Sequence, residues 1–416
     1  MRVNKPRLKT MRWIGLCILA VASAALGQGV TYSTLERGRY LATTGNCASC
    51  HTADGGKPFA GGRAVPTPFG TIYSTNITPD RETGIGAWSN DEFYKAMHEG
   101  IRRDGQYLYP AFPYPWYTKL SARDVQAIKA YLGALPAVRQ QNKPSELPWP
   151  LSVRAVMAGW NALFFREGSF RTDLNKSAQW NRGAYLVEGL GHCSACHTPK
   201  NVLGGLKKNQ PLEGGFGEHW YASSLTGDLR DGLGSWSARD IVEYLKTGSN
   251  SKAAAAGPMT DVIRNSTQHL TDDDLNAIAT YLKDMPRTTD ENTQTVRALD
   301  PSVLSRGEAL YVDNCTGCHM QDGAGLAQVF PPLKASAAVQ ASDPTTVLHH
   351  IMGGATMAAT KEKPTGLAMP AFGWKLNDQE IAALATYIRN TWGNRADAVT
   401  ERQVVKVRKD SPASAH

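Results

Sequence analysis

The pentapeptide Cys47-Ala-Ser-Cys50-His51 recurs twice in this chain, as Cys193-Ser-Ala-Cys196-His197 and as Cys315-Thr-Gly-Cys318-His319. Cys-x-x-Cys-His is the spacing of covalent c-type haem attachment, in which both thiols become thioethers and the adjacent imidazole binds the iron. One copy alone could also be a redox dithiol or half of a zinc site. Because three copies use every cysteine except Cys17, we predict three covalently bound haem c groups.

Similar sequences flank the three copies, which indicates an internal repeat. Each motif follows an Arg-Gly pair, and each is followed by a Leu, a polar helix cap, an acid three residues after the cap and a Tyr ten residues after it. The Arg-Gly pairs are Arg37-Gly38, Arg182-Gly183 and Arg306-Gly307; the cap, acid and Tyr are Ser121, Asp124 and Tyr131, then Thr271, Asp274 and Tyr281, then Asn377, Glu380 and Tyr387. A cap followed by such an acid starts a helix, because their side chains satisfy free backbone donors. We therefore predict an all-α chain of three tandem cytochrome c-like haem domains joined by linkers, with the first and last helices of each domain crossing beside its haem.

Composition sets the expected boundaries of these domains. Domain 1 spans 28–140, domain 2 spans 180–286 and domain 3 spans 301–395, with linkers at 141–179 and 287–300 and a polar, frayed tail at 396–416. The first linker contains the apolar stretch 153–165. That stretch could be a helix packed on its own domains, a surface for a partner subunit or an interfacial membrane contact.

Residues 1–27 have the pattern of a secretory signal peptide, with a basic stretch through Arg12 followed by an apolar run and small residues. The apolar run is short for a transmembrane helix. The segment holds five basic residues and no acid, so its removal lowers the formal net charge from +8 to +3. We therefore predict a periplasmic protein, and the charge gives no reason to expect a nucleic-acid partner.

The second axial ligand of each iron decides its potential and reactivity, and a Met thioether raises the potential. Met369, in Ala-Met-Pro before the last cap, and Met259, in Gly-Pro-Met, are the predicted ligands in domains 3 and 2. The equivalent loop of domain 1, Leu108–Tyr117, contains no Met. Met97 reads as a core residue on a helix and His98 is a weaker candidate, so an unusual ligand or a vacant position stays open for the first iron.

The remaining histidines are less informative. His192 is most simply explained as a surface residue, although it could form a hydrogen bond near the second haem. His349 and His350 are most simply explained as ordinary residues of a helix in the third repeat. No Ser-His-Asp set, phosphate loop, zinc pattern or carboxylate pair is evident, so we predict no catalytic residue.

Several further motifs carry a family resemblance. They are the Arg-Gly-x-Tyr-Leu lead-in, Asn76-Ile-Thr-Pro-Asp80, Gly84-Ile-Gly-x-Trp88, Leu108-Tyr-Pro-Ala and Trp180-Asn-Arg-Gly-Ala-Tyr185. Together they resemble the three-haem cytochrome c subunit of bacterial membrane-associated dehydrogenases, which serve alcohol, gluconate, fructose, glucose and aldehyde oxidation. Many of these relatives carry Met where this chain has Phe112.

The resemblance implies an electron-transfer subunit without chemistry of its own. A large dehydrogenase subunit of the flavin, quinone or molybdenum type would supply electrons, and ubiquinone or a terminal oxidase would accept them. It also implies peripheral association with the outer face of the cytoplasmic membrane. Two other classes stay open: a free periplasmic multihaem electron shuttle, and a haem enzyme acting at an open first haem.

Overall fold

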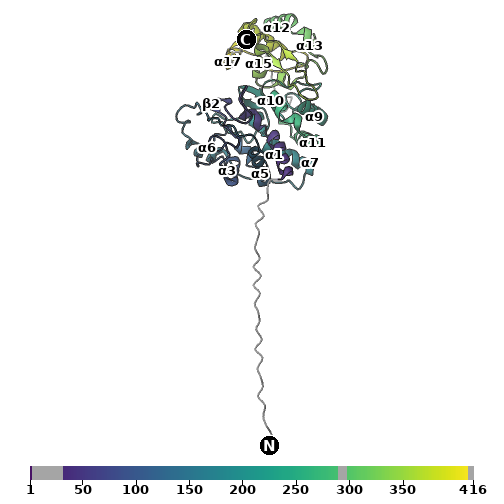
Figure 1. The fold of residues 1–416 in the computed structure, drawn as a ribbon. Coiled ribbons are helices and arrows are strands. Elements are labelled where there is room, and N and C mark those ends of the chain that lie inside the picture. The colour runs from purple at the N-terminus through teal and green to yellow at the C-terminus, as the bar shows by residue number, and fades with distance from the viewer. Residues whose placement is uncertain (2–30, 289–297, 411–416) are drawn as a thin grey trace.

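The computed structural model describes residue 1, residues 31–288 and residues 298–410. The predicted signal peptide at 1–27, most of the predicted linker at 287–300 and the last six residues therefore lie outside the described residues. Residues 31–288 form one lobe and residues 298–410 a second, which gathers at the end of the molecule that carries the C-terminus (Figure 1). These two lobes are called the N-terminal and C-terminal lobes below.

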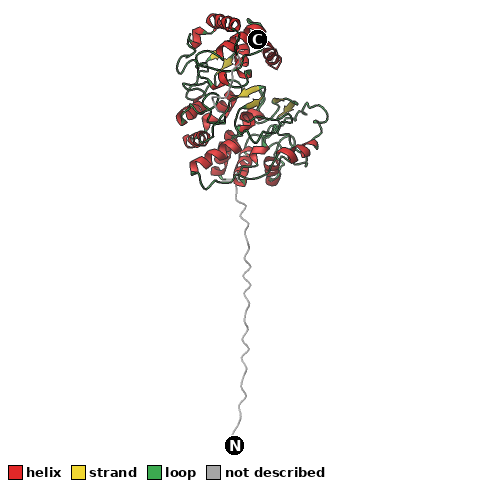
Figure 2. Cartoon of the chain, turned by 180° about the vertical axis from the view of Figure 1, so that it is seen from behind, coloured by secondary structure: helices red, strands yellow, loops and turns green. Residues whose placement is uncertain are grey.

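The described chain is largely helical, with short two-stranded sheets between the helices (Figure 2). Its first part forms α1 (Tyr32–Thr44), α2 (Cys47–His51), β1 (Ala64–Thr67), β2 (Gly70–Tyr73), α3 (Asn90–Glu99), α4 (Tyr114–Tyr117) and α5 (Ala122–Gly133). The middle part forms α6 (Val156–Phe164), α7 (Ala178–Tyr185), the π-helix η1 (Leu186–Leu190), α8 (Ser194–His197), β3 (Gly215–Gly217), β4 (Trp220–Ala222), α9 (Ala238–Thr247), α10 (Pro258–Asn265), the 3₁₀-helix η2 (Thr267–His269) and α11 (Asp272–Lys283). The C-terminal lobe forms α12 (Pro301–Asn314), α13 (Thr316–His319), α14 (Ala337–Gln340), α15 (Thr345–Gly353), β5 (Ala355–Thr356), β6 (Ala368–Met369), α16 (Asp378–Ile388) and α17 (Glu401–Asp410).

Three helix pairs, α1 with α5, α7 with α11 and α12 with α16, are the main packing units. Each pair crosses at the glycine of an Arg-Gly motif. A Cβ on Gly38 would lie 1.9 Å from the Ala127 carbonyl oxygen, and one on Gly183 would lie 2.0 Å from that of Ala277. At Gly307 the corresponding distance, to the Ala383 carbonyl oxygen, is 2.4 Å. Only a residue without a side chain allows the two backbones to approach this closely.

The predicted starts of the three closing helices are confirmed. Ser121, Thr271 and Asn377 accept hydrogen bonds from the backbone N–H of the acid three residues on. Only Asn377 forms the complete capping box, because the carboxylate of Glu380 also accepts from the Asn377 backbone. The other two acids are used differently, and they join two helix pairs.

Asp124 and Asp274 each accept from an arginine of their own helix pair and from a tyrosine of the other pair. Asp124 accepts from Arg37 at 2.8 Å and from the Tyr185 hydroxyl at 2.6 Å. Asp274 accepts from Arg182 at 2.7 Å and from the Tyr40 hydroxyl at 2.6 Å. The contacts are reciprocal, so the first two helix pairs face each other in a pseudo-twofold arrangement. In the third pair, Arg306 contacts Glu380 at 3.3 Å and Ala309 occupies the position of these tyrosines.

The apolar stretch of the first linker contains α6. Met157 is its one buried residue, whereas Val153, Val156 and Leu163 expose apolar side chains. The expected frayed tail is wrong for residues 401–410, because α17 packs on the C-terminal lobe through the buried Val404 and Val407. None of the helices formed by the described residues combines the length and apolar composition needed to cross a bilayer.

Candidate haem sites

Each Cys-x-x-Cys-His motif lies on a short helix, and in each the histidine ring is held by a backbone carbonyl. His51 Nδ1 lies 2.6 Å from the Thr75 oxygen, His197 Nδ1 lies 2.7 Å from that of Ser223, and His319 Nδ1 lies 3.0 Å from that of Pro331. Burial lowers the pKa of all three imidazoles and favours their neutral form. A neutral ring that donates from Nδ1 keeps the lone pair of Nε2 for a metal. All three rings therefore suit the proximal position of a haem.

The cysteines of these motifs form no disulfide. Burial raises the pKa of Cys47 and of Cys193 to about 12 and that of Cys315 to about 11. A redox Cys-x-x-Cys pair instead has a lowered thiol pKa. No group of three or more His, Cys, Asp or Glu in the described residues forms a set suited to a metal ion. Paired thiols next to an oriented imidazole fit thioether attachment of haem.

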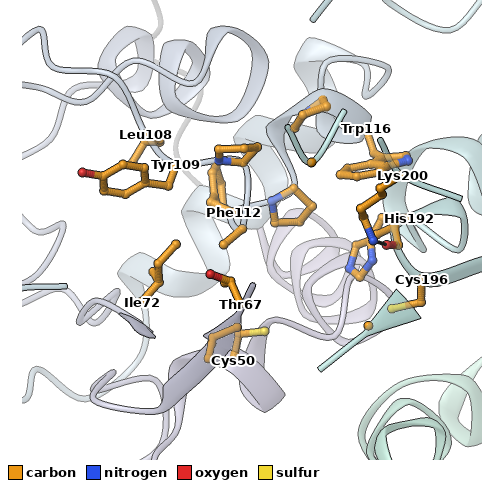
Figure 3. A pocket seen from close by; sticks show the side chains of 18 of the residues that line it. Cys50, Thr67, Ile72, Leu108, Tyr109, Phe112, Trp116, His192, Cys196 and Lys200 are labelled. Carbon is orange, nitrogen blue, oxygen red and sulfur yellow. Dashed lines mark hydrogen bonds between the residues drawn. The ribbon is translucent and has the colours of Figure 1, made fainter. Parts of the chain in front are cut away.

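A cavity of about 2530 Å³ lies in the N-terminal lobe and extends to its contact with the C-terminal lobe. Cys47, Cys50 and His51 line it from one direction, and Cys196 lines it from the second motif. Figure 3 shows Cys50 and Cys196 facing this space together with Phe112, His192 and Lys200. The cavity exceeds the 300–1,000 Å³ typical of small-molecule sites, so it has room for large prosthetic groups.

The two predicted Met ligands lie in different local structures. Met259 is the second residue of α10 and packs against the cluster of Ala255, Ile263 and Ala358. Met369 is in β6, where it pairs with Ala355 of β5. Both side chains are half-buried, and their ligation stays a prediction.

Met97 and His98, the two other candidates for the first iron, are buried. Met97 lies in the core of the first helix pair and also lines the cavity. His98 stacks on Tyr94 with a ring separation of 4.0 Å, and its buried Nε2 has no hydrogen-bond partner. His192 lies 5.8 Å from the ring of Tyr117, and burial lowers its pKa.

His349 and His350 lie on a helix, as predicted. Both lie on α15 beside Trp220 of β4, where the two lobes meet. Burial lowers the pKa of His350 to about 4.

The backbone acceptors of the first two histidines were not predicted from the sequence. Thr75 and Ser223 each follow the second strand of a hairpin, β2 or β4. The sequence does carry a signal for them, because Tyr-Ser-Thr75-Asn-Ile and Tyr-Ala-Ser223-Ser-Leu align when the first two repeats are superposed.

Comparison with known proteins agrees with these sites. Residues 35–136 and 304–392 match the Cytochrome c family. The chain is 42% identical to a gluconate 2-dehydrogenase cytochrome c subunit of Pantoea cypripedii, with 97% of this chain and 96% of that protein covered. It is 40% identical to the cytochrome c subunit of an alcohol dehydrogenase (quinone) of Gluconobacter oxydans, covering 95% and 86% of the two chains. It is 37% identical to a fructose dehydrogenase cytochrome subunit of Gluconobacter japonicus, covering 90% and 82%.

The fold and the sites define a cytochrome c, an electron-transfer protein with covalently attached haem. Within this class the chain belongs to the family of cytochrome c subunits of dehydrogenases, as the resemblance in its motifs predicted.

Proposed function

We propose that this chain carries three haem c groups and relays electrons from a large dehydrogenase subunit to ubiquinone or a terminal oxidase. The observation that supports three haems is one arrangement found three times. In each, a Cys pair and a carbonyl-bound His follow a helix that crosses its partner at glycine, at Gly38, Gly183 and Gly307. We assign these units to domains at 28–140, 180–286 and 301–395.

The residues of each unit hold and tune the cofactor. When bound, each haem supplies a reversible one-electron iron couple. The two cysteines fix the porphyrin edge, and the backbone carbonyl fixes the ring plane of the His ligand. Thioethers from Met259 and Met369 would raise the potentials of the second and third irons. No acid or base of this chain is needed, since the partner oxidises the substrate.

The place and partners of the chain follow the family. We propose export to the periplasm by residues 1–27 and peripheral association with the outer face of the cytoplasmic membrane. The partner would be of the flavin, quinone or molybdenum type. The exposed side chains of Val153, Val156 and Leu163 on and beside α6 offer an apolar surface for such a contact.

Haem stoichiometry in protein purified from its native host tests the first part of this proposal. We expect the intact mass to exceed that of the mature chain by three haems, and the pyridine haemochrome assay to give three per chain. Cys193→Ala with Cys196→Ala should remove one haem and leave the other two. A wild-type count of two would contradict the three-haem assignment.

Purification under mild conditions tests the partner. We expect a dehydrogenase subunit to co-elute and its substrate to reduce the haems of this chain. Elution alone, with no reduction by any co-expressed dehydrogenase, would instead favour a free shuttle.

A further inference from the structure

The first repeat contains a phenylalanine at the position where the third repeat contains its predicted thioether ligand. Ala111-Phe112-Pro113 lies nine residues before the Ser121 cap, and Ala368-Met369-Pro370 lies eight residues before the Asn377 cap. The flanking Ala and Pro are the same. The two segments are therefore equivalent, and they differ in whether a sulfur atom is available.

The geometry places Phe112 in the cavity of the first motif. Phe112 is half-buried and lines the same space as Cys47, Cys50 and His51. Its ring meets that of Tyr117 edge-on at 5.6 Å, and Figure 3 shows its side chain facing the space beside Cys50. A benzyl group has no lone pair for iron, so this position excludes water by its bulk and leaves the iron without a ligand from the loop.

The cavity is also lined by methionine and histidine side chains that could replace the missing ligand: Met97, Met157, His192, His219 and His349. His219 and His349 lie together where β4 meets α15, beside the second motif and not the first. Met97 is 4% exposed and packs in the core of the first helix pair, at a position where the second repeat has Leu245. Leu245 packs against the core of the second helix pair, so this helix position is a core position in both repeats.

Met157 and His192 come from other parts of the chain than the Phe112 loop. Met157 lies on α6, which is tied to Tyr114 through a 2.5 Å hydrogen bond from the tyrosine hydroxyl to Asn161. His192 precedes Cys193 of the second motif, and its ring lies near Tyr117 and near Gly45, two residues before Cys47. It is therefore near the attachment edge of the first haem, and within the loop it contacts Tyr117, the last residue.

The tyrosine hydroxyls of the loop are hydrogen-bonded to other residues of the chain. The Tyr109 hydroxyl donates to the Leu151 carbonyl at 2.8 Å, and the Tyr117 hydroxyl donates to that of Gly45 at 3.1 Å. The Tyr114 hydroxyl is held by Asn161. A loop whose tyrosine hydroxyls are all engaged favours neutral ligands over ones that need a hydrogen bond from it.

We propose that the first haem is five-coordinate, with an apolar distal pocket walled by Phe112 that binds a small neutral diatomic ligand. This inference rests on the proposed haem at Cys47 and Cys50, and carbon monoxide is the probe that tests it. In the purified full-length protein we expect a high-spin ferric signal from one haem by electron paramagnetic resonance. After reduction we expect about one equivalent of CO to bind per chain.

Two substitutions at one position give a matched pair. Phe112→Met introduces the thioether found in the third repeat, so it should remove the high-spin signal and CO binding and add the far-red band of a thioether–ferric bond. Phe112→Leu is apolar without sulfur and should retain both signals. Haem content and circular dichroism verify that each variant is folded.

A ferric spectrum that is entirely low-spin, in protein containing three haems, would overturn the inference. Met97→Leu, Met157→Leu or His192→Ala would then create the high-spin signal by removing the ligand actually used. A haem count below three would contradict the proposed function, whereas a low-spin spectrum at full haem content contradicts only the open first site.

Discussion

Gly38 lies where α1 crosses α5, and its missing side chain is what allows the crossing. A Cβ there would lie 1.9 Å from the Ala127 carbonyl oxygen and 2.8 Å from the Tyr131 Cβ, both on α5. We predict that Gly38→Ala lowers the free energy of unfolding by about 1–3 kcal/mol, as overpacking does. Gly133→Ala on α5 is the control, since an added Cβ there meets nothing within 4 Å. Urea unfolding measures both, and equal effects would show that the crossing is not the cause.

Asp274 provides a pH-dependent contribution to stability. Burial would raise the pKa of its carboxyl, but hydrogen bonds from Arg182 and Tyr40 and the charge of Arg182 together lower it below the ordinary value. A depressed carboxyl pKa contributes stability above the ordinary pKa and loses it as pH falls through the folded value. The contribution is therefore complete at neutral pH and disappears below about pH 4.

We predict that Asp274→Asn lowers stability at pH 7 by about 1–3 kcal/mol, because Arg182 loses its charged partner. The loss relative to wild type should shrink between pH 4 and pH 3. Unfolding in urea across this range measures it. Asp273→Asn, at an exposed position on the same helix, is the control. A difference between wild type and Asp274→Asn that stays constant with pH would contradict the linkage.

At the scale of elements, α17 is a polar helix with two buried valines. Val404 is fully buried against the cluster that includes Ile381 and Ile388 of α16, and Arg408 donates to Asp378 at 2.8 Å. We predict that Val404→Ala destabilises the C-terminal lobe by about 1–3 kcal/mol, whereas Val405→Ala, one residue along and less buried, has a smaller effect. Thermal unfolding of the two variants measures the difference. Equal stabilities would mean that α17 does not hold the lobe.

Helices whose start signals lie close by in the sequence could be predicted from local sequence patterns. The caps at Ser121, Thr271 and Asn377 and the short helix before each motif could be predicted because their signals lie within about ten residues. The π-helix η1 also has a sequence cause. Cys193 follows Arg182 by eleven residues and Cys47 follows Arg37 by ten, so the wide turn absorbs the additional residue.

Elements that depend on distant partners could not be predicted. The apolar stripe of α17 is narrow in a charged sequence, and only α15 and α16 reveal what it covers. Tyr40 belongs to the Arg-Gly-x-Tyr-Leu motif, but its hydrogen bond could not be predicted, because the acceptor, Asp274, lies 234 residues away. The same limit applies to the haem sites. The cysteines and histidines are adjacent in sequence, whereas the carbonyls that orient the rings come from loops 12 to 26 residues later.

At the scale of the whole molecule, the three helix pairs are not joined equally. The first two pairs share the reciprocal bonds of Tyr40 with Asp274 and of Tyr185 with Asp124. The C-terminal lobe instead meets the N-terminal lobe mainly through polar contacts, such as the 2.6 Å bond from Thr346 to the Tyr221 carbonyl. Its apolar cluster with the other lobe is small, with Ala358 set against Ala255 and Ile263. A molecule connected in this way should unfold as two cooperative units.

We predict that native-state hydrogen exchange separates these units, residues 31–288 and 298–410. Tyr40→Phe with Tyr185→Phe leaves two carboxylates with one hydrogen bond fewer each, at about 1 kcal/mol per bond, and should lower the protection of α1, α5, α7 and α11 together. Val404→Ala should lower the protection of α15 and α16 and leave the first four helices unchanged. Tyr32→Phe, at a side chain that is 79% exposed, is the control and should change neither unit. If either set of substitutions lowers protection in both lobes by the same amount, the chain unfolds as one unit and the lobe contact is stronger than its polar bonds suggest.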